Sequence, residues 1–276
     1  MGRRGHQGRR RRRHRDRPQR LRRTLRAGAE EDRRMTDSAP VVTVSGMLCD
    51  ATLWDDVRHS FGPRVVDVVP TAPSIAEMAE EVLVASDGPF VLIGLSLGAI
   101  VGFEVLRQAP ERVTAFAAMS TNAGAPTKAQ RTGWATFDAQ TRRGGFSEVV
   151  RDSILPTMFA APEPPAHHAG RFTAMAEQVG PEAFRRQLAA QATRTDATAS
   201  LPEVAVPTLV LCGTADALCP PEFHRRIAGA VPGAELHALP GAGHLLPIER
   251  PAEVADHLTD WLTRCNTVEG NACPSS

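Results

Sequence analysis

The stretch "VLIGLSLGAIVG", residues 91–102, decides the interpretation of this chain. Apolar residues lead into a G-x-S-x-G pattern made by Gly94, Ser96 and Gly98, and an apolar helical pattern follows. A sharp turn between a strand and a helix presents a serine hydroxyl at the sheet edge, and it needs very small residues two positions before and after. A packing corner is the alternative for Ser96, but the strand before it and the helix after it favour a nucleophile.

Short valine-rich runs alternate with amphipathic segments on both sides of this stretch. This alternation is typical of parallel strands joined by crossover helices, so the sequence predicts an α/β fold with a mostly parallel sheet. The expected strands are 41–46, 65–69, 90–94, 113–120, 207–213 and 234–239, and the expected helices are 74–86, 97–110, 221–231 and 251–262.

Residues 124–198 break this rhythm. They contain no valine-rich strand, and helical patterns at 127–143, 146–159, 166–179 and 181–194 are separated by glycine and proline. The sequence therefore predicts a small helical insertion here.

A serine needs a base to remove its proton, and the base needs an acid to orient it. Of nine histidines, only His244, in "LPGAGHLLPIERP", lies in a glycine-flanked loop between the last expected strand and helix. His224 is expected on a solvated helix face. Asp216 follows the strand in "PTLVLCGTADALCPP", and it is preferred over Asp196, in the insertion, and Glu249, which is too near His244 along the chain.

With Ser96, Asp216 and His244 each after a strand and in this order, residues 37–264 resemble the α/β-hydrolase superfamily. The resemblance implies the catalytic triad and makes residues 124–198 a helical lid. The implied division is an arm at 1–36, core at 37–123 and 199–264, and a tail at 265–276. The overall pattern is most similar to small carboxylesterases, including pimeloyl-type methyl ester and enol-lactone hydrolases.

The stretch "VSGMLCDATLWDDV", residues 44–57, resembles the family's loop after the first strand, with Trp54 at the family's tryptophan position. By that resemblance, the backbone N–H groups of Met47 and Leu97 form the oxyanion hole. Ser45 stands where the family usually has histidine.

The resemblance implies a serine hydrolase that cleaves a small to medium carboxylic ester through an acyl-enzyme, without metal or organic cofactor. Thioesterase, lactonase and acyltransferase activities would use the same residues. A second class of function is a receptor that binds a small molecule on this fold without turnover. The expected acyl group is moderately apolar, because the insertion is rich in Ala, Met, Phe and Gln.

The formal net charge of the whole chain is +1, but the charges are unevenly distributed. Residues 1–34 are strongly basic, with 15 arginines and 4 acidic residues. We expect this arm to be disordered, and we expect no nucleic-acid binding, although its arginines are of the type that contacts phosphate. No apolar run approaches membrane-spanning length. The five cysteines show no metal spacing and, without a secretory signal, favour the cytoplasm. The sequence does not indicate whether the protein is a monomer or an oligomer.

Overall fold

The computed structural model describes residues 39–269. The expected arm at 1–36 and the end of the expected tail, 270–276, lie outside the described residues. Within the described part, no helix combines the length and the apolarity needed to cross a membrane.

The centre of the fold is a six-stranded sheet in the order β2-β1-β3-β4-β5-β6, in which every neighbouring pair is parallel. The strands are β1 (Val41–Val44), β2 (Val65–Val68), β3 (Phe90–Leu95), β4 (Val113–Met119), β5 (Thr208–Gly213) and β6 (Glu235–Leu239). Each lies within about one residue of a predicted strand or inside it. The α/β class and the parallel sheet are therefore confirmed.

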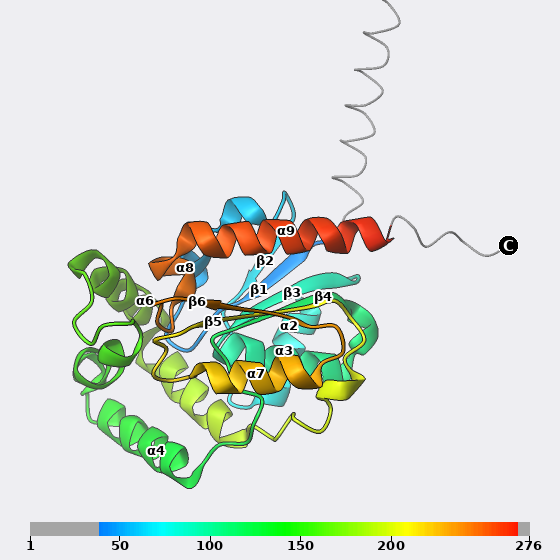
Figure 1. Ribbon diagram of the computed structural model, residues 1–276. Coiled ribbons are helices and arrows are strands. Elements are labelled where there is room, and N and C mark those ends of the chain that lie inside the picture. Colours follow the sequence, from blue (N-terminus) through cyan, green and yellow to red (C-terminus); the bar gives the residue numbers. More distant parts are fainter. Residues whose placement is uncertain (1–38, 270–276) are drawn as a thin grey trace, which may run out of the picture. The chain divides into compact units, whose positions relative to one another are not determined.

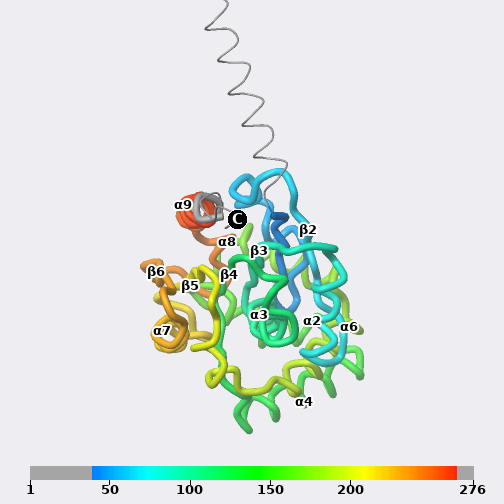
Figure 2. Tube along the Cα trace, turned by 90° about the vertical axis from the view of Figure 1, so that its right-hand side faces the viewer, coloured from blue at the N-terminus to red at the C-terminus, as the bar shows by residue number. Residues whose placement is uncertain are grey.

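Helices cover both faces of the sheet (Figures 1 and 2). The α-helices are α2 (Ile75–Val84), α3 (Leu97–Gln108), α4 (Lys128–Arg142), α5 (Phe146–Glu148), α6 (Ala166–Thr193), α7 (Pro221–Ala230), α8 (Leu246–Glu249) and α9 (Pro251–Glu269). Short 3₁₀ and π turns are η1 (Ala51–Trp54), η2 (Arg58–Ser60), η3 (Pro110–Arg112), η4 (Val149–Ile154), η5 (Leu155–Thr157) and η6 (Leu201–Glu203). Helices α2, α3 and α7 lie on one face and α9 on the other.

Two buried apolar clusters lie on opposite faces of the sheet, and alternate residues of a strand contribute to each of them. On β3, Leu92 packs in the cluster that includes the residues of α2, α3 and α7, whereas Ile93 packs in the cluster that includes α9. Because both faces of a crossover-linked parallel sheet are covered, its central strands are mostly apolar, and β3 is buried at all six of its residues without a polar side chain.

The segment between β4 and β5 is helical, as predicted. Its longest helix, α6, contains a break at Gly180, whose φ of 75° is followed by Pro181. That conformation favours glycine, so the break falls where the sequence placed it. Whether this segment acts as a lid stays a prediction.

The last helix is longer than expected. The sequence pattern predicts a helix that ends at residue 262 and a tail from 265, but α9 continues to Glu269. The physical reason is that Cys265 continues the buried face of Leu258, Trp261 and Leu262, so another turn of helix covers apolar surface.

Candidate active site

Ser96 lies on a strained turn between β3 and α3. It is not a glycine, yet its φ is 55° and its ψ is −112°, a combination that is held only by well-determined surroundings. Its N–H donates to the Met119 carbonyl at 2.8 Å, and the Thr121 hydroxyl donates to the Ser96 carbonyl at 3.0 Å. The turn is therefore anchored to the strand end beside it.

The two glycines of the pattern leave no room for side chains. A Cβ on Gly94 would lie 2.5 Å from the Ala99 nitrogen, and a Cβ on Gly98 would overlap the Val44 carbonyl oxygen. These neighbours are backbone atoms, so a rotamer change could not relieve either clash. The tight approach of α3 to β1 and β3 thus depends on both glycines.

His244 and Asp216 form a buried pair. His244 Nδ1 lies 2.8 Å from Asp216 Oδ2, and both residues are 3% exposed. Asp216 Oδ1 accepts from the backbone N–H groups of Leu218 and Cys219, both at 2.9 Å. Burial by itself would raise the pKa of Asp216, but His244 and these N–H donors hold it below the usual value. The carboxylate can therefore stay ionised and orient the imidazole.

One cavity of about 170 Å³ brings most of the expected site together. Ser96, His244 and Met47 line it, and Asp216 lies behind His244. Trp134 from α4 and Gln191 from α6 form part of its wall. The helical segment between β4 and β5 thus shapes the space in front of Ser96.

The loop after β1 lies at this cavity, and two hydrogen bonds of the Ser45 hydroxyl stabilise it. The Trp54 indole donates to the Ser45 hydroxyl at 3.2 Å, and that hydroxyl donates to the Asp50 carbonyl at 3.0 Å. Ser45 thereby fixes the loop through its hydroxyl. Leu97 is the first residue of α3, a position whose N–H has no acceptor within the helix.

Gln187 supports this site although the sequence pattern does not indicate it. It is fully buried on α6, accepts from the Leu48 N–H at 3.1 Å and donates to the Pro70 carbonyl at 3.0 Å. Leu48 has a positive φ of 62°, so the bond supports a strained residue next to Met47. A glutamine on a helix gives no sequence signal for such a contact.

The expectation that His224 is solvated is wrong. It is fully buried, and its Nε2 accepts from the Thr121 N–H at 2.8 Å, while Nδ1 faces the Pro220 carbonyl at 3.4 Å. Burial lowers the pKa of His224 to about 4, although the negative charge of Asp216 acts to raise it. The neutral ring therefore fixes the segment whose Thr121 hydroxyl holds the Ser96 carbonyl.

Glu249 is not the carboxylate that pairs with His244, as expected, since Asp216 has that position. Its carboxylate accepts from the backbone N–H groups of Ala160 and Gly243, at 2.8 and 2.6 Å. It therefore connects the helical segment to the loop that carries His244.

Asp216, Cys219 and His244 place one potential metal ligand each within 4.8 Å of one another. The donor chemistry fits a metal poorly, because both Asp216 oxygens already accept hydrogen bonds and burial raises the pKa of the Cys219 thiol, which keeps it protonated. The arrangement suits proton transfer better.

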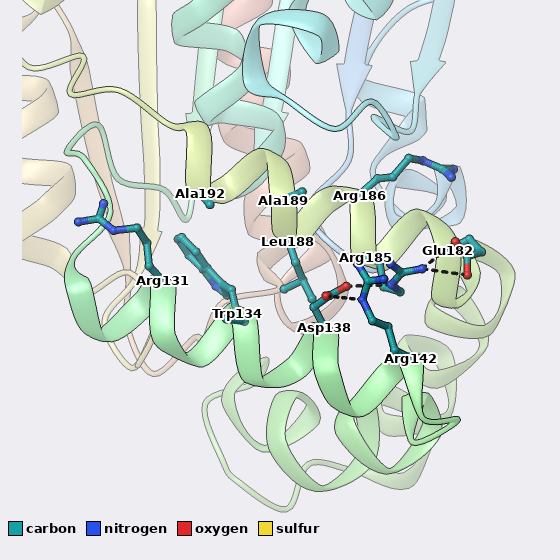
Figure 3. Close-up of a pocket in the computed structure, with 11 residues that line it drawn as sticks. Arg131, Trp134, Asp138, Arg142, Glu182, Arg185, Arg186, Leu188, Ala189 and Ala192 are labelled. Carbon is teal, nitrogen blue, oxygen red and sulfur yellow. Dashed lines mark hydrogen bonds and ion pairs between the residues drawn. The ribbon is translucent and has the colours of Figure 1, made fainter.

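A larger hollow of about 320 Å³ lies between α4 and α6 (Figure 3). Asp138 pairs there with Arg142 and Arg185, both at 2.8 Å. Trp134 lines this hollow as well as the cavity at Ser96, but none of Ser96, Asp216 and His244 lines it. Its arginines are largely satisfied by ion pairs and by carbonyls.

Comparison with known proteins agrees with this fold. The sequence profile of the Alpha/beta hydrolase family matches residues 3–257. The chain belongs to this family, and it is a hydrolase.

Among curated relatives, RutD of Klebsiella pneumoniae, whose name gives it as a provisional carbamate hydrolase, is 27% identical over 64% of this chain and 68% of its own. Among solved structures, a thermophilic esterase from Thermogutta terrifontis, with malate bound, has a TM-score of 0.76 and 26% identity, covering 83% of this chain and 91% of that one. The enol-lactonase of Burkholderia xenovorans has a TM-score of 0.69 and 24% identity over 83% and 93%, and supports the fold alone.

Proposed function

We propose that this protein is a serine hydrolase that cleaves a small to medium carboxylic ester through an acyl-enzyme. The observation that carries the proposal is that Ser96, on its strained turn, and His244, held by Asp216 at 2.8 Å, line one cavity. Hydroxyl, imidazole and carboxylate in this relation are what acyl transfer at a carbonyl requires.

In the first half-reaction, Ser96 Oγ attacks the ester carbonyl carbon while His244 Nε2 takes the hydroxyl proton. The carbonyl oxygen becomes an oxyanion, and the backbone N–H groups of Met47 and Leu97 are proposed to hold it. As the intermediate collapses, the bond to the alcohol oxygen breaks, and His244 gives its proton to the leaving alkoxide.

In the second half-reaction, water attacks the acyl-Ser96 ester while His244 takes a proton from it. The C–O bond to Ser96 then breaks, the serine recovers its proton from His244, and the carboxylic acid leaves. Asp216 stays ionised and stabilises the imidazolium in both halves. We propose that residues 124–198 are the lid that shapes the acyl site, since Trp134 and Gln191 line the cavity.

The test is hydrolysis of p-nitrophenyl esters of graded acyl length by the wild type and Ser96→Ala. Loss of a triad serine lowers kcat by roughly six orders of magnitude in a serine protease, so the variant should be inactive. The matched control is Ser153→Ala, because Ser153 is an exposed serine on η4 that does not line the cavity. This control variant should match the wild type.

Activity that survives Ser96→Ala would refute the mechanism. A wild type that binds esters, thioesters or lactones without turning any over would instead favour the receptor alternative. Including a thioester, a lactone and a carbamate in the panel ranks the substrate classes.

A further inference from the structure

Arg194, which follows the last residue of α6, is a buried arginine with unused hydrogen-bond donors. It is 7% exposed, and its Nη1 donates to Gln191 Oε1 at 3.1 Å. Within the described residues, its Nε and Nη2 have no hydrogen-bond partner. A guanidinium keeps its charge in proteins, so a buried one normally pairs with an anion.

The charge of Arg194 is not balanced by the walls of the cavity it lines. This is the cavity of Ser96 and His244, and none of its lining residues, all within the described part, is Asp or Glu. The Cys219 thiol is also there, but burial raises its pKa and keeps it neutral. Arg194 is therefore the one Arg, Lys, Asp or Glu side chain among the described lining residues, and the carboxylate of Asp216 lies behind His244, outside the lining.

Nearby carboxylates are engaged elsewhere. Arg194 also borders a small hollow that includes Glu104 and Asp196. Glu104 pairs with Arg107 at 2.5 Å, and Asp196 accepts from the Thr198 N–H at 2.8 Å. The end of α6 favours a cation through the helix dipole, but this gives neither Nε nor Nη2 a hydrogen-bond acceptor.

The free groups of Arg194 have the spacing that a carboxylate uses. Nε–H and Nη2–H form one edge of the planar guanidinium, and two parallel N–H donors match the two oxygens of a carboxylate. The opposite side is held by Gln191, and the guanidinium carbon lies 5.8 Å from the centroid of the Trp134 ring. The fork is thus oriented before any ligand binds, but both free nitrogens are shielded from solvent, so a carboxylate reaches them only by displacing part of the cavity wall.

We propose that Arg194 binds a carboxylate of the substrate. The preferred substrates are then small esters that carry a free carboxylate in addition to the ester group that is cleaved. This inference rests on the proposed function. The cavity of about 170 Å³ fits such a small molecule better than a long acyl chain.

The test compares monomethyl glutarate with methyl valerate, two esters of similar length that differ in a terminal carboxylate, by following acid release at constant pH near 7.5. The wild type should favour monomethyl glutarate in kcat/KM by at least about tenfold. Arg194→Met should lose about 30- to 100-fold on monomethyl glutarate and less than about threefold on methyl valerate. Arg194→Lys keeps the charge without the fork, so its preference should be intermediate.

Arg186→Met is the matched control, because Arg186 is an exposed arginine on the same helix that does not line this cavity. It should behave as the wild type with both esters. An unchanged ratio between the two esters in both Arg194 variants would overturn the inference while leaving the proposed function intact.

A binding measurement separates the two proposals. Glutarate should raise the Tm of Ser96→Ala, which cannot turn over, but not the Tm of Ser96→Ala combined with Arg194→Met. Glutaramide, which is neutral, should have no effect on either, and inorganic phosphate should act more weakly than glutarate. An equal shift in both variants would overturn the role of Arg194 even if Ser96 proved not to be the nucleophile.

Discussion

At the scale of single residues, the site depends on backbone positions that only small or well-anchored residues tolerate. The positive φ of Ser96 costs about 1–3 kcal/mol in general. The bonds from Ser96 N–H to Met119 and from the Thr121 hydroxyl to Ser96 offset part of it. The resulting turn leaves the Ser96 side chain at the cavity.

Gly98→Ala should destabilise the protein by about 2–4 kcal/mol, because the new Cβ would overlap the Val44 carbonyl and push α3 from β1. Urea unfolding measures this loss. Gly133→Ala is the control: nothing lies within 4 Å of its added Cβ in α4, so it should stabilise by about 0.5–1 kcal/mol. Equal stability of the two variants would contradict the role given to the tight turn.

Asp216→Asn should lower kcat for ester hydrolysis by roughly 10⁴-fold, because an amide cannot stabilise the imidazolium and favours the wrong tautomer of His244. Steady-state kinetics at pH 7.5 measure this, with circular dichroism to show that the variant is folded. A loss smaller than about tenfold would mean that another group orients His244.

At the scale of elements, the helical segment is bonded to the catalytic core from several sides. Glu249 connects the loop of His244 to Ala160, and Gln187 connects α6 to the loop after β1. The cavity wall and the proposed oxyanion hole therefore share a support, and a change in α6 should reach the chemistry.

Gln187→Ala should lower kcat about tenfold with a smaller change in KM, because Leu48 loses the acceptor that holds its strained backbone beside Met47. Gln178→Ala, at an exposed glutamine of the same helix, should leave both constants unchanged. If KM alone rose for Gln187→Ala, the bond would serve substrate binding and not the oxyanion.

At the scale of the whole molecule, the buried His224 makes stability depend on pH. Its pKa is about 4 when folded and near 6.5 when unfolded, so the unfolded state binds the extra proton between these values. Its neutral form is fully compatible with folding above pH 6.5, and stability is lost as the pH falls from 6.5 toward 4. Glu249 acts in the opposite direction, because burial raises its pKa.

His224→Gln separates these effects, since the amide oxygen can still accept from Thr121 but does not titrate. The wild type should lose up to about 3 kcal/mol more than the variant between pH 7 and pH 4, given about 1.4 kcal/mol for each pKa unit. Urea unfolding at pH 7, 5.5 and 4.5 measures the difference. Parallel pH profiles would show that folding does not lower the pKa of His224.

Several features could be predicted from local sequence. The valine-rich runs, the break at Gly180-Pro181 and the strand–serine–helix pattern each depend on neighbouring residues, and the structure has these elements where they were expected. The end of α9 was misjudged because the burial of Cys265 depends on its contacts across the fold.

By itself, the sequence determined the parallel α/β architecture and the chain order of Ser96, Asp216 and His244, because periodicity and turn chemistry are local. Only the tertiary structure decided which polar residues are buried and what they contact. Gln187 reaches Leu48 across 139 residues, and His224 reaches Thr121 across 103. Arg194 is a third such case, since an arginine at the end of a helix is usually solvated. Only the packing of α4 and α6 buries this one in the wall of the cavity that Ser96 also lines.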